Sequence, residues 1–308
     1  MREDIEFKAS DGTVLRGWHY RPDGPSADPH PVIVISHGYG AVKEMALEVF
    51  AQQFSGAGLA CLVYDHRCFG DSDGQPRQEI APFVQVSDTH DAITFASGLA
   101  DVHPARVGLW GTSYSGGHSL QVAATDSRVR CVVAQVPTIS GSRNTVRRFP
   151  GDALAEAQRA WAEDRAARAN GEQPSMVAVA PELTEADVSS TGDAANLRND
   201  MGAWVKATPA EDLRTWRNET TLRSQELYAA YEPGSYIDRI APTPLLMICM
   251  SQDTITPTDE ILHAYRDACE PKRLVLLPGG HCDVYGAQRS AAAEAAAGWF
   301  HEHLAGQA

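Results

Sequence analysis

Three residues have the types and the order that nucleophilic catalysis needs: Ser113, Asp253 and His281. Each follows a short apolar run. Each is therefore expected beyond the end of a buried strand, where the catalytic groups of open α/β sheets gather. A serine hydroxyl is a weak nucleophile and needs a base to take its proton. The order serine, acid, histidine predicts Ser113 as the nucleophile, His281 as its base and Asp253 as the acid that orients the base.

The segment around Ser113 supports the first of these assignments. Residues 108–117 read Gly-Leu-Trp-Gly-Thr-Ser-Tyr-Ser-Gly-Gly and lie between a strand-like run and a helix-like run. This is the context of a nucleophile elbow, a sharp strand–turn–helix bend that exposes the serine hydroxyl. The usual pattern has glycine two residues after the nucleophile, where this chain has Ser115. An ordinary turn between a strand and a helix is the alternative interpretation.

Other acidic and histidine residues compete for the roles of acid and base. Asp259 is expected in the first turn of the next helix, where a negative charge is favourable. Asp283 is too close to His281 in sequence to orient its ring easily. His37 and His66 follow earlier strand-like runs and are candidates for lining the site.

Acyl transfer also needs two backbone N–H donors for the oxyanion that forms in the tetrahedral intermediate. The residue after the nucleophile supplies one donor in sites of this kind, which here is the N–H of Tyr114. The second is expected from the loop that follows the strand-like run 31–36, which reads His-Gly-Tyr-Gly over 37–40. Because its glycines let the backbone approach a ligand closely, the N–H of Tyr39 is the candidate.

The apolar pattern predicts the elements that position these residues. Short apolar runs without polar alternation, separated by helix-like segments, indicate a parallel sheet that is covered on both faces. The chain opens with a predicted hairpin of 2–8 and 13–20. Further strands are predicted at 31–36, 59–64, 106–110, 129–136, 244–250 and 273–277. Helices are predicted at about 43–57, 85–100, from 114 onward, 258–269 and 286–304.

Residues 139–240 do not show this alternation of strand-like and helix-like segments. The stretch is rich in alanine and charged residues, and helices are predicted at 151–169 and within 209–230. One interpretation is a helical decoration of the surface, and the other is a helical cap over the site. The cap is favoured because a segment inserted between two core strands can shape a pocket. The predicted organisation is therefore a core of 1–138 and 241–308 with a helical cap of 139–240.

Specificity is expected to come from this cap. Besides His37 of the core, its large side chains are the candidates for lining a substrate pocket: Trp161, Trp204, Trp216, Phe149 and Met201. The alternative is that most of them pack against the core and seat the cap.

Composition restricts the classes of partner. The 308 residues are 43% hydrophobic and 21% charged, as in an ordinary globular protein. A net charge of -14 argues against nucleic acid and against an anionic membrane surface, since both need clustered lysine and arginine. A small-molecule acyl substrate is expected instead, and the cap helices are candidates for a homodimer contact.

The six cysteines contain no C-x-x-C pair, and the first residues do not predict a secretion signal, so neither a disulfide framework nor a zinc site is expected. No apolar run follows the charged residues 2–6, and no stretch approaches the length of a membrane span. The cytoplasm is therefore the expected compartment, and no metal is expected.

Taken together, these motifs resemble those of the α/β-hydrolase superfamily. The resemblance implies an eight-stranded, mostly parallel sheet with helices on both faces, a cap after the sixth strand, and no cofactor. It rests on residues 37–40, Tyr-Asp-His-Arg at 64–67, Gly-Asp-Ser at 70–72, the elbow at 111–115, Asp253 with Pro257, and Gly280 with His281. The aspartate and arginine of 65–72 are expected to be structural.

A narrower similarity is to X-Pro-peptidase-like hydrolases, a subgroup that includes fungal polyketide transferases and thiohydrolases. It rests on residues 64–67, 75–80, 91–94 and 116–118. The extra domains of true X-Pro peptidases are not expected in a chain of this length. No acidic pair that would hold a peptide amine is identifiable.

The predicted function is that of a serine hydrolase that cleaves an ester or a thioester. If the cap excludes water and binds an alcohol or an amine, the same three residues would serve an acyltransferase. A carbon–carbon bond hydrolase and a binding protein on a hydrolase scaffold are weaker alternatives. Cleavage of a carbon–halogen bond is disfavoured, since it would need a carboxylate at the position of Ser113.

Overall fold

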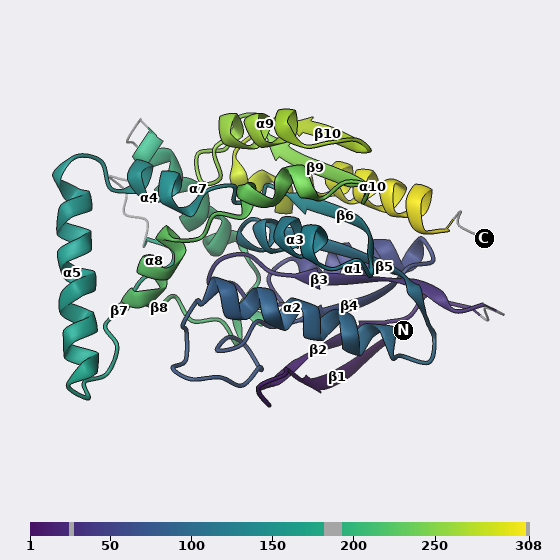
Figure 1. Cartoon of the computed structure of the whole chain (residues 1–308), viewed down its shortest axis with the longest axis horizontal. Helices are drawn as coiled ribbons and strands as arrows, with labels where there is room; N and C mark the ends of the chain where they lie inside the picture. Colours follow the sequence, from purple (N-terminus) through teal and green to yellow (C-terminus); the bar gives the residue numbers. More distant parts are fainter. Residues whose placement is uncertain (25–27, 182–192, 306–308) are drawn as a thin grey trace.

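One sheet of eight strands forms the centre of the structure, a computed structural model that describes residues 1–24, 28–181 and 193–305 (Figure 1). The strand order is β1-β2-β4-β3-β5-β6-β9-β10. β2 pairs antiparallel with β1 and β4, and all other neighbours are parallel, so the predicted mostly parallel sheet is confirmed. The bounds are Arg2–Lys8 (β1), Val14–Tyr20 (β2), His30–Ser36 (β3), Ala60–Tyr64 (β4), Val102–Thr112 (β5), Val129–Gln135 (β6), Leu245–Met250 (β9) and Lys272–Leu277 (β10).

Helices cover both faces of this sheet. Helices α2, α3 and α9 contribute to the apolar core on one face, and α1 and α10 contribute to the core on the other. Among the described residues, no helix is both long enough and apolar enough to cross a membrane. The bounds are Leu47–Gly56 (α1), Pro82–Ser97 (α2), Tyr114–Thr125 (α3), Thr258–Asp267 (α9) and Arg289–Phe300 (α10), with a turn of π-helix at His301–Ala305.

The two cores explain why the strands show no polar alternation. In β3, Val32 and Val34 belong to one core, while Ile33 and Ile35 belong to the other, and all four are buried. Successive side chains of a strand point to opposite faces. A strand covered on both faces therefore needs apolar residues at every position.

Helix α1 begins later than the sequence predicts. The predicted helix of about 43–57 is Leu47–Gly56, and the preceding Ala46 has a left-handed backbone with φ of 69°. The side chain of Lys43 forms a buried ion pair with Asp65 at 2.7 Å. This long-range contact holds 43–46 outside the helix, which a local pattern does not reveal.

The segment between β6 and β9 is largely helical in its described residues. Its elements are α4 (Gly141–Arg148), α5 (Asp152–Ala169), β7 (Met176–Val177), α7 (Asp193–Ala207), a 3-10 turn at Ala210–Leu213, β8 (Thr220–Thr221), α8 (Leu222–Ala229) and a 3-10 helix at Pro233–Arg239. We call this segment the insertion. β7 and β8 form a small antiparallel pair that the sequence does not predict, since strands of two residues are too short to have a pattern. Helix α5 stands at the outer end, with α8 between it and the sheet (Figure 1).

The bend at Ser113 brings a strand and a helix into close contact. Ser113 lies between β5 and α3 with φ of 56°, in the left-handed region that L residues rarely adopt. Its N–H donates to the carbonyl of Gln135 at 2.8 Å, and its carbonyl accepts from the N–H of Thr138 at 2.9 Å. A Cβ on Gly111 would lie 2.0 Å from the carbonyl oxygen of Ser115. Only glycine at 111 lets the strand and the helix approach this closely.

We therefore expect Gly111→Ala to lower the free energy of unfolding by about 3 kcal/mol or more, because the clash is with backbone that cannot yield. The matched control is Gly56→Ala at the end of α1, where a Cβ would meet nothing within 4 Å. That change should raise stability by roughly 0.5–1 kcal/mol. Urea-induced unfolding measures both, and equal effects of the two substitutions would contradict this account of the elbow.

Candidate active site

The three residues predicted from the sequence meet at one edge of the sheet. The Nε2 atom of His281 lies 3.0 Å from Ser113 Oγ. Its Nδ1 atom lies 2.7 Å from Asp253 Oδ2. The three residues follow β5, β9 and β10, whose carboxyl ends lie at the same edge because these strands are parallel. An imidazole placed in this way can take the proton of the serine hydroxyl while a carboxylate holds its other nitrogen.

The carboxylate of Asp253 is fixed by its own turn. Oδ1 accepts from the N–H groups of Ile255 and Thr256, each at 2.9 Å. The hydroxyl of Thr256 lies 2.8 Å from Oδ2 and 3.1 Å from His281 Nδ1. Sequence reasoning missed Thr256, although its position three residues after an aspartate in a turn is a local signal.

Charge around His281 favours its protonated form. Burial of the ring lowers its pKa, but the charge and the hydrogen bond of Asp253, together with the charge of Asp200, outweigh burial, and the pKa of His281 is raised. Asp200 comes from α7, and its Oδ2 accepts from the N–H of Cys282 at 3.2 Å. Burial raises the pKa of Asp200 itself. No motif marks this residue in the sequence, because only the folded insertion brings it to the site.

The two oxyanion candidates belong to segments that adjoin the nucleophile. Tyr114 is the first residue of α3, and the N–H groups of a first helical turn have no intrahelical acceptor. The loop with Tyr39 passes close to the elbow, since a Cβ on Gly38 would lie 3.2 Å from Ser113 Cβ. The two tyrosine rings contact each other edge to face, with 5.8 Å between their centroids. The two segments that contain the oxyanion candidates therefore lie next to each other at the nucleophile.

Ser115, which stands where the elbow pattern usually has glycine, connects the elbow to this loop. Its hydroxyl donates to the carbonyl of His37 at 2.5 Å and lies 2.7 Å from Nε2 of His66. The backbone N–H of His66 donates to Nε2 of His37 at 3.0 Å, so the N–H of the His37 ring is on Nδ1, 3.0 Å from the carbonyl of Gly38. Burial lowers the pKa of His37 to about 4, and that of His66 falls well below its usual value, so both rings are neutral near pH 7.

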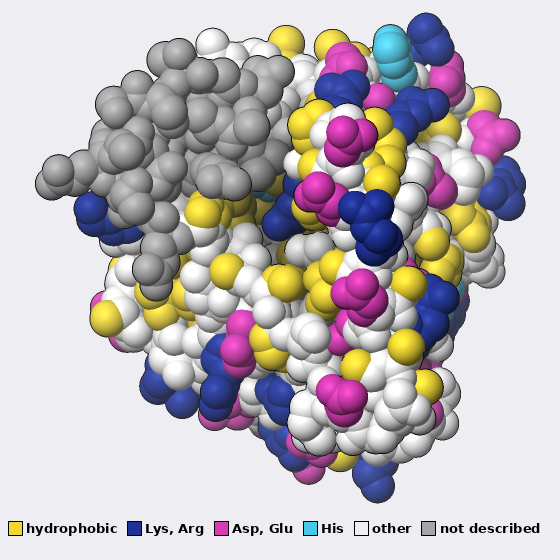
Figure 2. All heavy atoms as spheres, turned by 90° about the vertical axis from the view of Figure 1, so that its left-hand side faces the viewer, with side chains coloured by type: hydrophobic (Ala, Val, Ile, Leu, Met, Phe, Trp, Pro, Cys, Tyr) yellow, Lys and Arg dark blue, Asp and Glu magenta, His cyan; other side chains and the backbone are white. Residues whose placement is uncertain are grey.

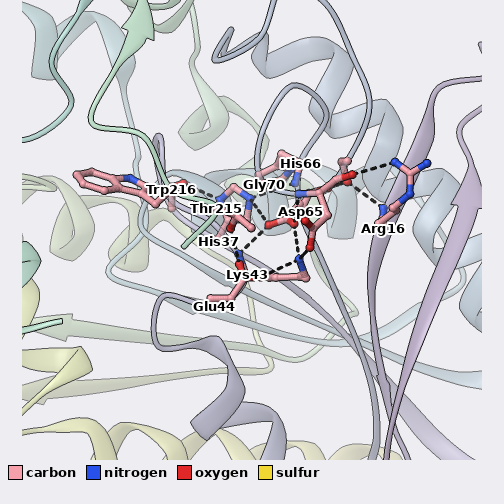
Figure 3. A network of polar contacts seen from close by, with 12 residues as sticks. Arg16, His37, Lys43, Glu44, Asp65, His66, Gly70, Thr215 and Trp216 are labelled. Atoms are coloured by element: carbon pink, nitrogen blue, oxygen red, sulfur yellow. Dashed lines mark hydrogen bonds and ion pairs between the residues drawn. The ribbon is translucent and has the colours of Figure 1, made fainter. Parts of the chain in front are cut away.

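A buried charge network lies behind the same loop (Figure 3). Asp65, which is fully buried, accepts from the N–H of Lys43 at 2.8 Å and from its ammonium group at 2.7 Å. The insertion reaches this region through Trp216, whose indole N–H donates to the carbonyl of Gly40 at 2.9 Å. Thr215 beside it donates to Glu44 at 3.1 Å. The loop is thus held from the core and from the insertion together.

A cavity of about 1590 Å³ opens above the nucleophile and is lined by both the core and the insertion. The face of the molecule in Figure 2 is hollowed near its centre, between hydrophobic side chains. Of the predicted pocket residues, Trp204, Phe149 and Met201 line the cavity.

The other predicted pocket residues, His37, Trp161 and Trp216, are not among its described lining residues. The two ring nitrogens of His37 form hydrogen bonds with the carbonyl of Gly38 and with the backbone N–H of His66. Trp161 of α5 is buried, and its ring packs against that of Phe149 with 6.4 Å between the ring centroids. The indole N–H of Trp216 donates to the carbonyl of Gly40. These three side chains therefore hold the loop and the insertion in place, and they do not line the cavity.

Comparison with known proteins gives a family match, two related proteins and one related crystal structure. The family model of X-Pro dipeptidyl-peptidase (S15 family) matches residues 11–283. A thiohydrolase of Eupenicillium brefeldianum is 33% identical over 92% of this chain and 88% of its own length. Polyketide transferase grgF of Penicillium sp is 32% identical over 92% of this chain and 91% of its own. The crystal structure of the alpha/beta hydrolase GrgF from Penicillium sp. sh18 superposes with a TM-score of 0.81 at 28% identity, over 99% of each chain.

The contacts of Ser115 predict that its hydroxyl keeps the loop in place. We expect Ser115→Ala to slow the reaction of Ser113 with a fluorophosphonate by about 10- to 100-fold, since small misplacements of reacting groups are costly. The free energy of unfolding should also fall, by about 1–3 kcal/mol, because buried polar groups of His37 and His66 lose this partner. The control is Ser119→Ala, one helical turn further along α3, which should react at the wild-type rate. Wild-type reactivity of Ser115→Ala would contradict this role.

The contribution of Asp200 to the charge around His281 predicts a pH effect. The base must be neutral to act, so the rate of fluorophosphonate labelling should rise with pH through the pKa of His281. Asp200→Asn removes a negative charge that raises this pKa, so the rise should move to lower pH. Labelling rates measured between pH 4 and pH 9 test this, and a rise that stays in place or moves to higher pH would contradict it.

Proposed function

The chain belongs to the X-Pro dipeptidyl-peptidase (S15) family, and on that premise we propose that it is a serine hydrolase that cleaves an ester or a thioester. It is a hydrolase-type enzyme with the α/β-hydrolase fold. The observation that carries the finer proposal is the line of hydrogen bonds from Ser113 Oγ through His281 to Asp253, with lengths of 3.0 and 2.7 Å.

The proposed reaction begins when Ser113 Oγ attacks the acyl carbon and His281 Nε2 takes the hydroxyl proton. The C=O bond becomes a C–O⁻ group, which accepts hydrogen bonds from the N–H groups of Tyr39 and Tyr114. Collapse of this intermediate breaks the bond to the alcohol or thiol, which receives the proton from His281 and leaves an acyl group on Ser113. Water then attacks the acyl-enzyme in the same way and releases the acid. Asp253 remains ionised throughout and stabilises the imidazolium.

The cavity favours an acyl group of considerable size as the substrate. Its volume of about 1590 Å³ exceeds that of most small-ligand pockets. Aromatic side chains line it, among them the contacting pairs Tyr39 with Tyr228 and Trp204 with Tyr285, together with Phe149. The names of the relatives, a thiohydrolase and a polyketide transferase, agree with extended acyl groups and support a thioester in particular.

Transfer of the acyl group to an alcohol or an amine is the second candidate. It is favoured by the burial of the reacting groups, since Ser113 is 9% and His281 2% exposed. The insertion residues Met201 and Trp204 line the same cavity as these two side chains. A site that limits access of water gives another nucleophile the opportunity to receive the acyl group.

We expect Ser113→Ala to abolish both labelling by a fluorophosphonate and hydrolysis of every ester and thioester that the wild type cleaves. Ser251→Ala is the matched control, because Ser251 also lines the cavity but has no imidazole partner among the described residues. It should be labelled like the wild type. Undiminished labelling of Ser113→Ala would refute the nucleophile assignment.

Product analysis separates the two candidate functions. A thioester with a long acyl chain is incubated alone and with primary alcohols or amines, and the acid and the new ester or amide are quantified by mass spectrometry. Release of acid alone under all conditions supports hydrolysis and counts against transfer. An acyl product that forms at the expense of the acid supports transfer.

A further inference from the structure

The three arginines of α4 differ in their partners. Arg143 pairs with Glu260 at 2.6 Å, and Arg147 pairs with Asp259 at 2.7 Å. Arg148 has no acidic partner among the residues that the structure describes. The Cζ atom of its guanidinium lies 5.7 Å from the centroid of the Phe149 ring. Arg148 also lines the cavity above Ser113. In a chain with a net charge of -14, it is a positive group in the cavity that has no acidic partner among the described residues.

Tyrosine rings connect the nucleophile to this arginine. The ring of Tyr114, next to Ser113, lies 5.8 Å from that of Tyr39 and 6.2 Å from that of Tyr228. Burial raises the pKa of Tyr39 to about 12 and also raises that of Tyr228, and the charge of Arg148 opposes both rises. Arg148 lines the same cavity as Tyr39 and Tyr228, and its charge acts on both of their hydroxyls.

Acidic side chains line the part of the cavity next to His281. Asp200 and Asp283 line it beside His281, in addition to Asp253. The leaving group must lie on this side, because it receives its proton from His281 Nε2. Two further carboxylates at this position repel a leaving group that has a negative charge close to the scissile bond. An anionic group of the substrate is therefore favoured on the acyl side, along the wall of Tyr39 and Tyr228.

We propose that Arg148 binds an anionic group at the far end of the acyl chain, so that the preferred substrates are half-esters or half-thioesters of dicarboxylic acids. A carboxylate fits the planar donor geometry of a guanidinium, which can bind both of its oxygens. The acyl chain between the two carbonyl groups lies against the tyrosine rings. This inference rests on the proposed function, because it assigns the acyl side from the roles of Ser113 and His281.

Three thioesters of similar length test the proposal. The first is the adipic half-thioester of N-acetylcysteamine, with its carboxylate on the acyl side. The second is the neutral hexanoyl thioester of the same thiol. The third is the hexanoyl thioester of 3-mercaptopropionate, with its carboxylate on the leaving group. We expect the wild type to give the highest kcat/KM with the first and the lowest with the third.

Arg148→Met should lower kcat/KM for the first thioester by about 10- to 100-fold, the range for loss of a charge-assisted hydrogen bond. Its kcat/KM for the neutral thioester should stay within about twofold of the wild type. Arg147→Met, which removes an arginine that already has acidic partners, is the control and should keep the preference. Added salt should weaken the preference of the wild type, since salt screens the part of it that is electrostatic attraction.

The outcomes separate this inference from the proposed function. Equal kcat/KM of the wild type for the first two thioesters, or equal losses with all three in Arg148→Met, would overturn the role of Arg148. The function would stand in that case, provided that Ser113→Ala abolishes turnover of the neutral thioester. Turnover of the neutral thioester by Ser113→Ala at the wild-type rate would instead overturn the function.

Discussion

The close approach of three backbone segments at Ser113 is the constraint on which the rest of the site depends. Strand β5, helix α3 and the loop after β3 meet there, and Gly111 and Gly38 allow the contact by having no side chain. Such crowding would leave little tolerance for error in the position of the loop. The hydroxyl of Ser115 bonds the carbonyl of His37 directly, so the elbow itself fixes the loop that has the oxyanion candidate Tyr39.

The buried histidines of this region differ in the charges around them. Burial lowers the pKa of His37 to about 4 and that of His118 to about 3, so these rings are neutral hydrogen-bonding groups near pH 7. His281 is equally buried, but the carboxylates of Asp253 and Asp200 raise its pKa. Only a ring with such partners can gain a proton during the reaction at a moderate free-energy cost. Its neighbours therefore distinguish a candidate base from a structural histidine.

Much of the fold and part of the site could be predicted from local sequence. The apolar runs predicted the parallel strands, and the resemblance to S15-like hydrolases is confirmed by the family match over residues 11–283. The predicted strand ends also indicated that Ser113, Asp253 and His281 lie beyond strands of the sheet. Asp200 could not be predicted, because its proximity to His281 depends on how the insertion folds back over the core. For the same reason, sequence could not separate Trp204, which lines the cavity, from Trp216, which binds the loop.

The acyl-enzyme is the species that both candidate functions share, and its detection tests the account most directly. The enzyme is mixed with an excess of a long-chain thioester, quenched with acid within milliseconds, digested and analysed by mass spectrometry. The account predicts the mass of the acyl group on the peptide that contains Ser113, specifically on that serine. Acylation of another residue, such as Cys282, or turnover at the normal rate with no acylated peptide at any time, would contradict it.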